Sequence, residues 1–310
     1  MNALPEYNNL PRLYLQAAHL SAIRCAIVHP CDAASLQGVV AAADKGLIVP
    51  ILVGPKAKIE QAAAAAQLAI HGYELVDVPH SHAAAETAAR MAVNQQVEAI
   101  MKGSLHTDEL MHAILAEKML RTGRRMSHIY RFDLPAYDKP LLITDCALNI
   151  NPTLLEKADI VQNAIHLAQI LGTHMPKVAI VSAVETVNPD ITSTVDAAAL
   201  CKMADRKQIT GALVDGPLAF DNAISPDSVR IKGIQSDVAG AADILVVPDL
   251  ESGNMLGKQL EYFGNADTAG IVLGARVPIA LTSRADATDT RVASLLLAQL
   301  VAHHYRTSPP

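Results

Sequence analysis

Hydroxyl, guanidinium and ammonium groups follow several short apolar runs in this sequence, and they are the first candidates for chemistry. Thr282, Ser283 and Arg284 come directly after the apolar run 277–281 and before an amphipathic stretch, 292–301. The run has the length and composition of a buried parallel strand, and the stretch has the pattern of a helix. Ligands bind at the carboxyl ends of strands in open α/β sheets, and helix N-termini favour anions. We therefore expect Ser283 and Arg284 to bind an anionic group; the alternative is that Ser283 begins a turn and Arg284 is a solvated charge.

A second polar segment, 102–108, follows the apolar run 97–101 and again stands between a predicted strand and a predicted helix. It contains a lysine, a glycine and two hydroxyl side chains, which would suit a phosphate oxygen. The candidate ligands in it are Lys102, Ser104 and Thr107. A role as helix N-cap for Thr107 or Asp108 is compatible with this expectation.

Three arginines interrupt the alternation of strands and helices near position 120. Arg121, Arg124 and Arg125 precede two strand-like runs, 126–132 and 140–144, that only a short turn separates. The short separation predicts an antiparallel hairpin instead of a helical crossover, and this change of pattern predicts a domain boundary. The arginines form either a solvated linker or an anion site near the domain junction, for which Arg121 and Arg124 are the candidates.

Polar side chains also follow the predicted strands that end near positions 214 and 247. The candidates there are Asp221, Asn222, Asn254 and Lys258. Ligands of open α/β sheets bind outside the carboxyl ends of the strands, so polar groups at successive strand ends indicate one cleft. This collection is typical of a site for an extended, phosphate-rich ligand.

Short apolar runs alternate with amphipathic stretches through most of the chain. The predicted strands are 24–28, 47–53, 74–78, 97–101, 126–132, 140–144, 177–182, 211–214, 243–247, 269–273 and 277–281. The longer predicted helices are 11–20, 32–45, 56–70, 83–95, 109–117, 153–171, 193–206 and 292–301. This alternation indicates an α/β fold with a parallel sheet.

The composition indicates a soluble, well-packed protein. The chain has 310 residues, enough for one large or two medium domains, with 51% hydrophobic and 18% charged residues. The net charge of −6, the 3% aromatic content and the absence of Trp argue against a nucleic-acid surface. No apolar run approaches the roughly 20 residues of a membrane span, and residues 1–11 lack the pattern of a signal peptide. We expect a cytoplasmic protein with no membrane or nucleic-acid partner.

The usual cofactor and metal motifs are missing from the sequence. It contains no Rossmann glycine motif, no P-loop, no GxSxG and no HExxH. The four cysteines are Cys25, Cys31, Cys146 and Cys201. They form no CxxC pair and are expected to be reduced thiols. His80 and His82 are the best metal-ligand pair, but no third ligand stands at a regular spacing, so no metal site is expected.

A set of short segments follows a characteristic order between residues 97 and 291. They are Met101-Lys102-Gly103, Leu120-Arg121-Thr122-Gly123-Arg124 with Ser127-His128, Tyr137-Asp138-Lys139, Ser182-Ala183-Val184-Glu185 with Val187-Asn188-Pro189, Val214-Asp215-Gly216-Pro217-Leu218-Ala219, Asp221-Asn222-Ala223-Ile224-Ser225, Val238-Ala239-Gly240, Gly253-Asn254 and Thr282-Ser283-Arg284-Ala285-Asp286. In this order and spacing, the chain resembles the phosphate acetyltransferase/phosphate butyryltransferase family, and the phosphate butyryltransferase branch more than the acetyl branch.

The resemblance implies a fold and a reaction. The fold would be α/β, a two-domain parallel-sheet fold of the isocitrate/isopropylmalate dehydrogenase-like type, with the active site in the interdomain cleft. The first domain would comprise residues 1–122 plus 270–310, and the second residues 123–269. The chain would be an acyltransferase for which acyl-CoA + phosphate = acyl phosphate + CoA, with butyryl or acetyl as the acyl group. Coenzyme A would be a substrate and no cofactor would be tightly bound; a homo-oligomer, dimer or larger, is implied.

The resemblance also implies roles for the residues of the last motif. Ser283 and Arg284 would act on the CoA thiol and on the phosphate and carbonyl oxygens. The position of the acetyl-branch base aspartate is Thr290 here, so the candidates for the base are Asp289, one residue earlier, and Asp286. No nucleophile with a paired base is evident, which favours direct transfer between thiol and phosphate in a ternary complex.

The sequence departs from the family pattern at one further position, and two alternative functions remain open. Relatives usually carry Tyr where this chain has Gly257, next to Lys258. The first alternative function is an NAD- and metal-dependent hydroxy-acid dehydrogenase of the same fold, which would need clustered metal ligands. The second is a non-catalytic CoA-binding module.

Overall fold

The computed structural model describes residues 10–310. Residues 1–9, on which most of the signal-peptide prediction falls, lie outside the described residues. The described chain divides into two compact units. We call residues 10–123 with 269–310 the first unit, and residues 124–268 the second unit.

The sheet of the first unit has the strand order β3-β2-β1-β4-β11-β10. Its strands are β1 (Ile23–Val28), β2 (Ile48–Gly54), β3 (Glu74–Asp77), β4 (Ala99–Lys102), β10 (Asp267–Leu273) and β11 (Ile279–Ala280). The pairs from β3 to β11 are parallel, whereas β10 and β11 are antiparallel. Only residues 274–278 join these two strands, too few for the crossover that a parallel pair needs. Strand β11 is also shorter than the strand predicted over residues 277–281.

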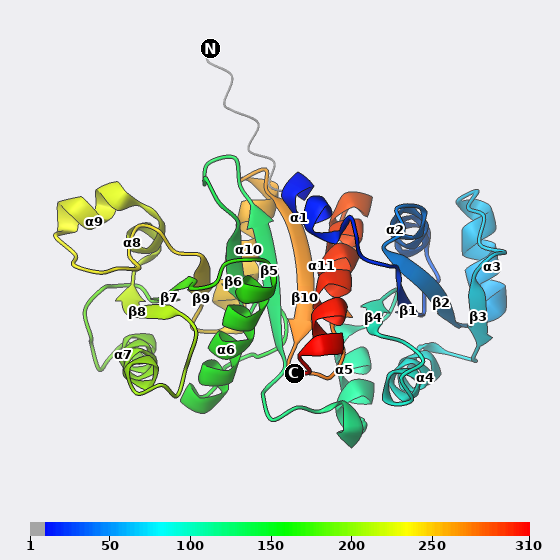
Figure 1. The fold of residues 1–310 in the computed structure, drawn as a ribbon, viewed down its shortest axis with the longest axis horizontal. Coiled ribbons are helices and arrows are strands. Elements are labelled where there is room, and N and C mark those ends of the chain that lie inside the picture. The colour runs from blue at the N-terminus through cyan, green and yellow to red at the C-terminus, as the bar shows by residue number, and fades with distance from the viewer. Residues whose placement is uncertain (1–9) are drawn as a thin grey trace, which may run out of the picture. The chain divides into compact units, whose positions relative to one another are not determined.

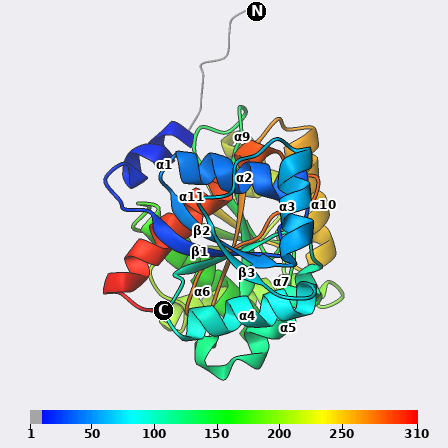
Figure 2. The same cartoon turned by 90° about the vertical axis from the view of Figure 1, so that its right-hand side faces the viewer.

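Helices cover both faces of this sheet. They are α1 (Leu10–Ala17), α2 (Ala33–Asp44), α3 (Lys56–Ala65), α4 (Ser81–Val93), α5 (Thr107–Ala116) and α11 (Thr288–Thr307), with the 3-10 helix η1 (Lys118–Leu120). Figure 2 shows α2 on one side of the strands and α4 and α5 on the other. The last helix, α11, packs against α2, β4 and β11 and is buried from Arg291 to Ala302. It begins earlier and ends later than the stretch 292–301 predicted for it.

The sheet of the second unit has the strand order β5-β6-β9-β7-β8. Its strands are β5 (Ser127–Asp133), β6 (Leu141–Thr144), β7 (Lys177–Val181), β8 (Leu213–Leu218) and β9 (Ile244–Val246). Strands β5 and β6 form the antiparallel hairpin that the sequence predicts, and the other pairs are parallel.

The helices of the second unit also lie on both sides of its strands (Figure 1). They are α6 (Leu154–Ile170), α7 (Thr192–Asp205), α8 (Phe220–Ile224), α9 (Pro226–Lys232) and α10 (Leu250–Tyr262). Phe220 of α8 and Leu256 of α10 pack against one core with Phe132 of β5 and Leu245 of β9. This core fixes α10 over the sheet.

One strand of the second unit was predicted too short, and the chain after it contains two further local structures. The strand predicted to stop before Asp215 continues to Leu218 because it pairs with β7 past a register shift. Residues 220–224, soon after this strand, form the short helix α8. The Ser236 hydroxyl accepts the N–H groups of Val238 and Ala239, both at 3.0 Å.

No described helix has the length and apolarity required to cross a membrane.

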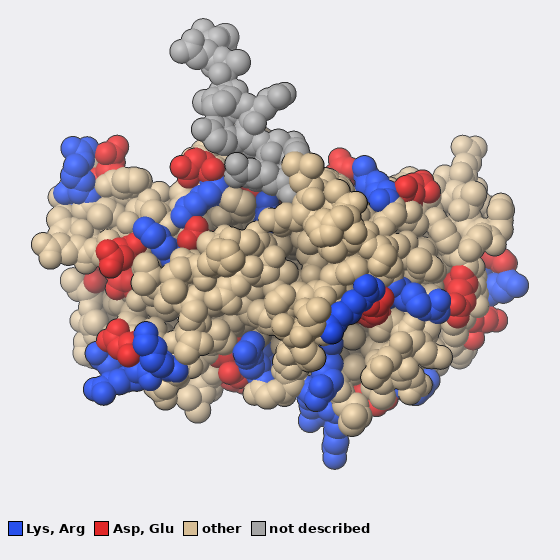
Figure 3. Space-filling view, in the orientation of Figure 1, with Lys and Arg blue, Asp and Glu red and all other residues tan. Residues whose placement is uncertain are grey.

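The surface carries many ion pairs. Basic and acidic side chains lie beside one another in several separate groups on the face in Figure 3. Examples of exposed pairs are Lys202–Asp205 and Arg230–Asp227. Exposed pairs of this kind contribute little to stability, because water and salt screen the two charges.

Candidate active site

The loop between β11 and α11, residues 281–287, carries Ser283 and Arg284. The backbone N–H of Ser283 donates to Oδ2 of Asp286 at 2.8 Å, and the Ser283 hydroxyl accepts the N–H of Ala285 at 3.4 Å. The Ser283 side chain is half-buried and that of Arg284 is exposed. Ser283 therefore does begin a turn, but it does not cap α11, whose N-cap is Ala287. Arg284 is thus accessible to a ligand, and Ser283 is partly accessible.

Lys102, at the end of β4, reaches the same loop. Its side chain is 5% exposed, and Nζ lies 3.4 Å from the carbonyl oxygens of Gly103 and Thr282. Burial lowers the pKa of Lys102, and the charges of Arg284 and Arg291 lower it further. The three positive charges of Lys102, Arg284 and Arg291 thus exceed the two negative charges of Asp32 and Asp286 at this strand end, which favours an anionic ligand.

Ser104 lies near the N-terminus of α2, where the structure adds a carboxylate that the sequence did not single out. Asp32 is the N-cap of α2 and accepts hydrogen bonds from the N–H and hydroxyl of Ser35 at 2.7 and 2.9 Å. Burial alone would raise the pKa of Asp32. The hydrogen bonds from Ser35 and Ser104, with the charge of Arg291, outweigh burial and lower that pKa. Ser104 therefore donates a hydrogen bond to the Asp32 carboxylate.

Thr107 begins α5, whereas Arg121 follows η1. Thr107 is the first residue of the helix, and its N-cap is His106, so the predicted capping role of Thr107 or Asp108 was wrong. Arg121 is exposed, and its Nε and Nη2 donate to the carbonyl oxygen of Leu115 near the end of α5. Arg121 thus binds a helix C-terminus, a favourable place for a cation.

The two candidate bases differ in their surroundings. Asp286 is 6% exposed and bonded to the Ser283 N–H. Asp289 is exposed in the first turn of α11, and its charge acts on Tyr14 of α1. Burial raises the pKa of Tyr14, and Asp289 raises it further. The structure therefore places Asp286, not Asp289, next to Ser283.

The remaining predicted residues belong to the second unit. Asp221 is exposed and lies 3.4 Å from Lys232 Nζ. Asn222 is fully buried and donates from Nδ2 to Glu185 Oε2 at 3.1 Å. A buried amide of this kind can orient Glu185 but does not present its own surface to a ligand.

The arginine and the two residues of α10 predicted in this unit have different exposures. Arg124 and Asn254 are exposed, and Asn254 donates to the Cys146 carbonyl oxygen at 3.3 Å. Lys258 is half-buried, with Nζ 2.7 Å from Glu261 Oε2 and 5.7 Å from the centre of the Tyr262 ring. The side chains of Asn254 and Lys258 are thus tied to local partners.

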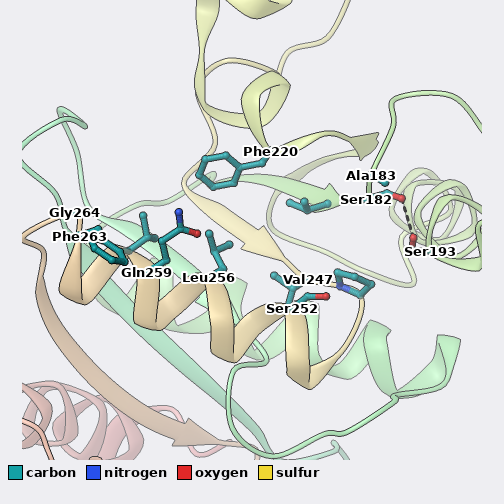
Figure 4. A pocket seen from close by; sticks show the side chains of 13 residues that line it. Ser182, Ala183, Ser193, Phe220, Val247, Ser252, Leu256, Gln259, Phe263 and Gly264 are labelled. Carbon is teal, nitrogen blue, oxygen red and sulfur yellow. Dashed lines mark hydrogen bonds between the residues drawn. The ribbon is translucent and has the colours of Figure 1, made fainter.

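A cavity of about 760 Å³ lies in the second unit beside α10 (Figure 4). Ser252, Leu256, Gln259 and Phe263 line it from this helix and its C-terminus. Ser182 and Ser193 line the opposite side and share a hydrogen bond of 2.8 Å. None of the predicted site residues lines this cavity.

His80 and His82, the pair considered and rejected as metal ligands, have other contacts. His80 is the N-cap of α4, and its Nδ1 accepts the N–H of Ala83 at 3.1 Å. His82 Nδ1 lies 2.8 Å from Glu109 Oε1. Within residues 10–310, no three His, Cys, Asp or Glu side chains are grouped so that they could hold a metal ion. The four cysteines are free thiols; burial raises the pKa of Cys31 to about 11 and that of Cys201 to about 12.

Comparison with known proteins decides the family. The model of the family described as phosphate acetyl/butaryl transferase matches residues 81–299. The chain belongs to the phosphate acetyl/butyryl transferase family. The match includes every predicted site residue. Members with these names are acyltransferases, so the chain is an enzyme of that class.

Two curated relatives illustrate the branches. A phosphate acetyltransferase of Rhizobium meliloti is 57% identical over 91% of this chain and 90% of its own length. A phosphate butyryltransferase of Clostridium acetobutylicum is 40% identical over 87% of this chain and 90% of its own. The expected order of the branches was therefore wrong: this acetyltransferase is the more similar of the two.

Solved structures support the fold. A branched-chain phosphotransacylase from Enterococcus faecalis V583 has a TM-score of 0.80 and 33% identity, covering 91% of this chain and 99% of its own. A 4-hydroxythreonine-4-phosphate dehydrogenase from Klebsiella pneumoniae has a TM-score of 0.54 and 15% identity, covering 91% and 100%. The second likeness concerns the fold alone, and it agrees with the dehydrogenase-like α/β fold that the resemblance implies.

Two residues of this phosphate acyltransferase were missed by sequence reasoning. Asp32 carries a usable signal, because an aspartate directly before a helix and after a strand is a standard N-cap. Arg291 carries none: it lies three residues into α11 as one of several polar residues of the first turns. Its burial at 2% exposure depends on contacts with distant segments.

Proposed function

We propose that this enzyme transfers an acetyl group between coenzyme A and inorganic phosphate. The observation that carries the proposal is the 57% identity to a protein named phosphate acetyltransferase over nearly the whole chain. The placement of Lys102, Ser283 and Arg284 at neighbouring strand ends of one unit supports it. These residue types suit a reaction whose substrate and transition state are both anionic.

The chemistry can be written with these side chains. Toward acetyl-CoA, the CoA thiol loses its proton and its sulfur attacks the carbonyl carbon of acetyl phosphate. The carbonyl oxygen gains charge, the C–O bond to phosphate breaks and phosphate leaves. A thiol with a pKa near 8.5 is mostly protonated at neutral pH, so a base accelerates its attack.

Roles for the side chains follow from their places. The Arg284 guanidinium would bind phosphate and the developing oxyanion, because its planar donors suit such oxygens. The Ser283 hydroxyl would orient the thiol. We assign the base to Asp286 in place of Asp289, because Asp286 is the carboxylate bonded at Ser283. The direct transfer needs no covalent enzyme intermediate.

Substrate roles in the second unit rest on the resemblance. We propose that Arg124, Asn254 and Lys258 contact coenzyme A or phosphate, and that Asp221 and Asn222 act through the Glu185 and Lys232 contacts. We also propose that the enzyme works in the cytoplasm as a homo-oligomer. Light scattering on the purified chain measures its oligomeric state.

The acyl group is tested by kinetics with acetyl-, propionyl- and butyryl-CoA, following CoA release with saturating phosphate. Acetyl-CoA is expected to have the highest kcat/KM. A buried CH₂ is worth about 0.8 kcal/mol, roughly fourfold, so the two additional CH₂ groups of butyryl would give a butyryl site a preference of about tenfold or more the other way. A preference for butyryl-CoA would mean that this enzyme transfers butyryl and not acetyl groups. A parallel reaction with NAD and a hydroxy acid tests the dehydrogenase alternative, for which reduced nicotinamide would be the product.

A further inference from the structure

The buried side chain of Arg291 contacts three consecutive residues of the loop between β11 and α11. Its Nη1 donates to the hydroxyl oxygen of Thr282 at 3.0 Å. Its Nη2 donates to the carbonyl oxygens of Ser283 and Arg284 at 3.0 and 3.1 Å. One guanidinium therefore binds a side chain and two backbone carbonyls of the segment that carries the proposed site.

Other buried groups hold the same segment. Lys102 Nζ lies 3.4 Å from the Thr282 carbonyl oxygen, and Asp286 accepts the N–H of Ser283 at 2.8 Å. The strand β11 ends at Ala280, so residues 282–284 have no ladder of strand hydrogen bonds. Buried side chains replace that ladder, and Arg291 supplies three of the contacts.

A glycine on α2 makes room for this arginine. A Cβ added at Gly38 would lie 2.7 Å from Arg291 Cβ and 2.8 Å from its Cδ, closer than carbon atoms approach without displacement. Glycine is unfavourable inside a helix, so its presence here reflects the close approach of α11. The aliphatic part of Arg291 is thereby fixed, and the guanidinium is directed at the loop.

We propose that Arg291 is a positioning residue, which holds the backbone of residues 282–284 so that the Ser283 hydroxyl and the Arg284 guanidinium point at the reacting groups. The inference rests on the proposed function, since it assigns Arg291 a role only through those two side chains. Arg291 itself, at 2% exposure, does not present its surface to a substrate.

A lysine cannot reproduce these contacts, because a single ammonium cannot span acceptors on three residues as a planar fork does. Displacing catalytic groups by about 1 Å reduces rates on the order of 10²-fold. Arg291→Lys is therefore expected to lower kcat by about 10- to 100-fold, with KM for phosphate and acetyl-CoA changing much less.

The matched control lies on the same helix. Gln299 is 1% exposed and donates to the Ser21 carbonyl oxygen at 3.0 Å, away from the loop. Gln299→Ala should lower the melting temperature and leave kcat near the wild-type value. Should Arg291→Lys fail to fold, Gly38→Ala displaces the same side chain and is measured in its place.

The experiment compares kcat, KM and melting temperature for the wild type, Arg291→Lys, Gln299→Ala and Ser283→Ala. It also measures whether free guanidinium restores kcat to Arg291→Ala at concentrations too low to denature the wild type. A selective fall in kcat, with guanidinium rescue, supports the proposal. Wild-type kcat in Arg291→Lys, or losses that only follow melting temperature in both α11 variants, overturns it. Unimpaired Ser283→Ala instead overturns the proposed site, whatever the Arg291 result.

Discussion

Asp286 accepts the backbone N–H of Ser283 through Oδ2 at 2.8 Å, across the turn that follows β11. Asp289, three residues further on, is exposed on α11 and acts electrostatically on Tyr14. The turn thus brings one of the two candidate carboxylates to the serine and directs the other away.

This contact predicts how substitutions of Asp286 behave. An asparagine oxygen can still accept the Ser283 N–H but cannot take up a proton as a base. If Asp286 is the base, Asp286→Asn should stay folded and lose about 10²-fold or more in turnover. Asp289→Asn, the matched control, should retain turnover. The measurement is the pH profile of kcat/KM for both variants; a normal acid limb in Asp286→Asn would remove Asp286 from the proton transfer.

Arg284 should not tolerate replacement by lysine. Its exposed guanidinium can bind a phosphate or oxyanion with two parallel hydrogen bonds, which an ammonium cannot. Loss of such a donor costs on the order of 10²–10³ in turnover. Melting temperature should change little because the side chain is exposed. Steady-state kinetics with varied phosphate measure the effect, and wild-type turnover in Arg284→Lys would speak against its role.

Lys102 predicts a pH dependence of stability. Burial and the neighbouring arginines lower its pKa in the folded state, while the unfolded pKa is near 10.4. Below the folded pKa the buried charge destabilises the fold. As the pH rises through the folded pKa, that cost is relieved, since only the unfolded chain still binds the proton.

Lys102→Met, of similar volume, removes this effect. Its stability advantage over the wild type should be greatest near pH 7 and shrink by pH 10. Urea unfolding at both values measures it, with exposed Lys207→Met as the control. A stability advantage of Lys102→Met that grows with pH would mean that the charge of Lys102 does not destabilise the fold.

Alanine substitutions at two glycines of α10 should have very different effects on stability. A Cβ at Gly257 would lie 3.4 Å from the nearest atom of Tyr130, an ordinary contact. Gly257→Ala should therefore be neutral or stabilising by up to about 1 kcal/mol, because alanine favours helix. A Cβ at Gly253 would overlap the Asp145 carbonyl oxygen and lie 2.9 Å from Val247 Cγ2. Gly253→Ala should destabilise by about 1–3 kcal/mol. Thermal unfolding of the pair checks the prediction, and equal effects would refute this packing.

Much of the fold follows from local signals. Helix α2 is predicted within a residue because Asp32 caps its start and Gly46, with a φ of +71°, follows its end. Helix α6 begins where Thr153 and Glu156 form a capping box. Such residues act on neighbours in the sequence, so single-sequence reasoning detects them.

The features that the sequence did not predict depend on tertiary contacts. Helix α8 forms in a segment without helical periodicity, where the Asn222 carbonyl oxygen accepts the distant N–H of Gly240 at 2.8 Å. The role of Arg291 depends on Gly38, on another helix. Ser283 and Arg284 could be selected from their place after a strand, but the choice between Asp286 and Asp289 required the turn itself.

The central claim is phosphate-dependent acetyl transfer at Ser283 and Arg284, and CoA release from acetyl-CoA measures it most directly. Wild-type enzyme should release CoA only when phosphate is present. Ser283→Ala should lose about 10²-fold in turnover while its melting temperature changes little, because Ala287, not Ser283, caps α11. Folded Ser283→Ala with near wild-type, phosphate-dependent turnover would contradict the account.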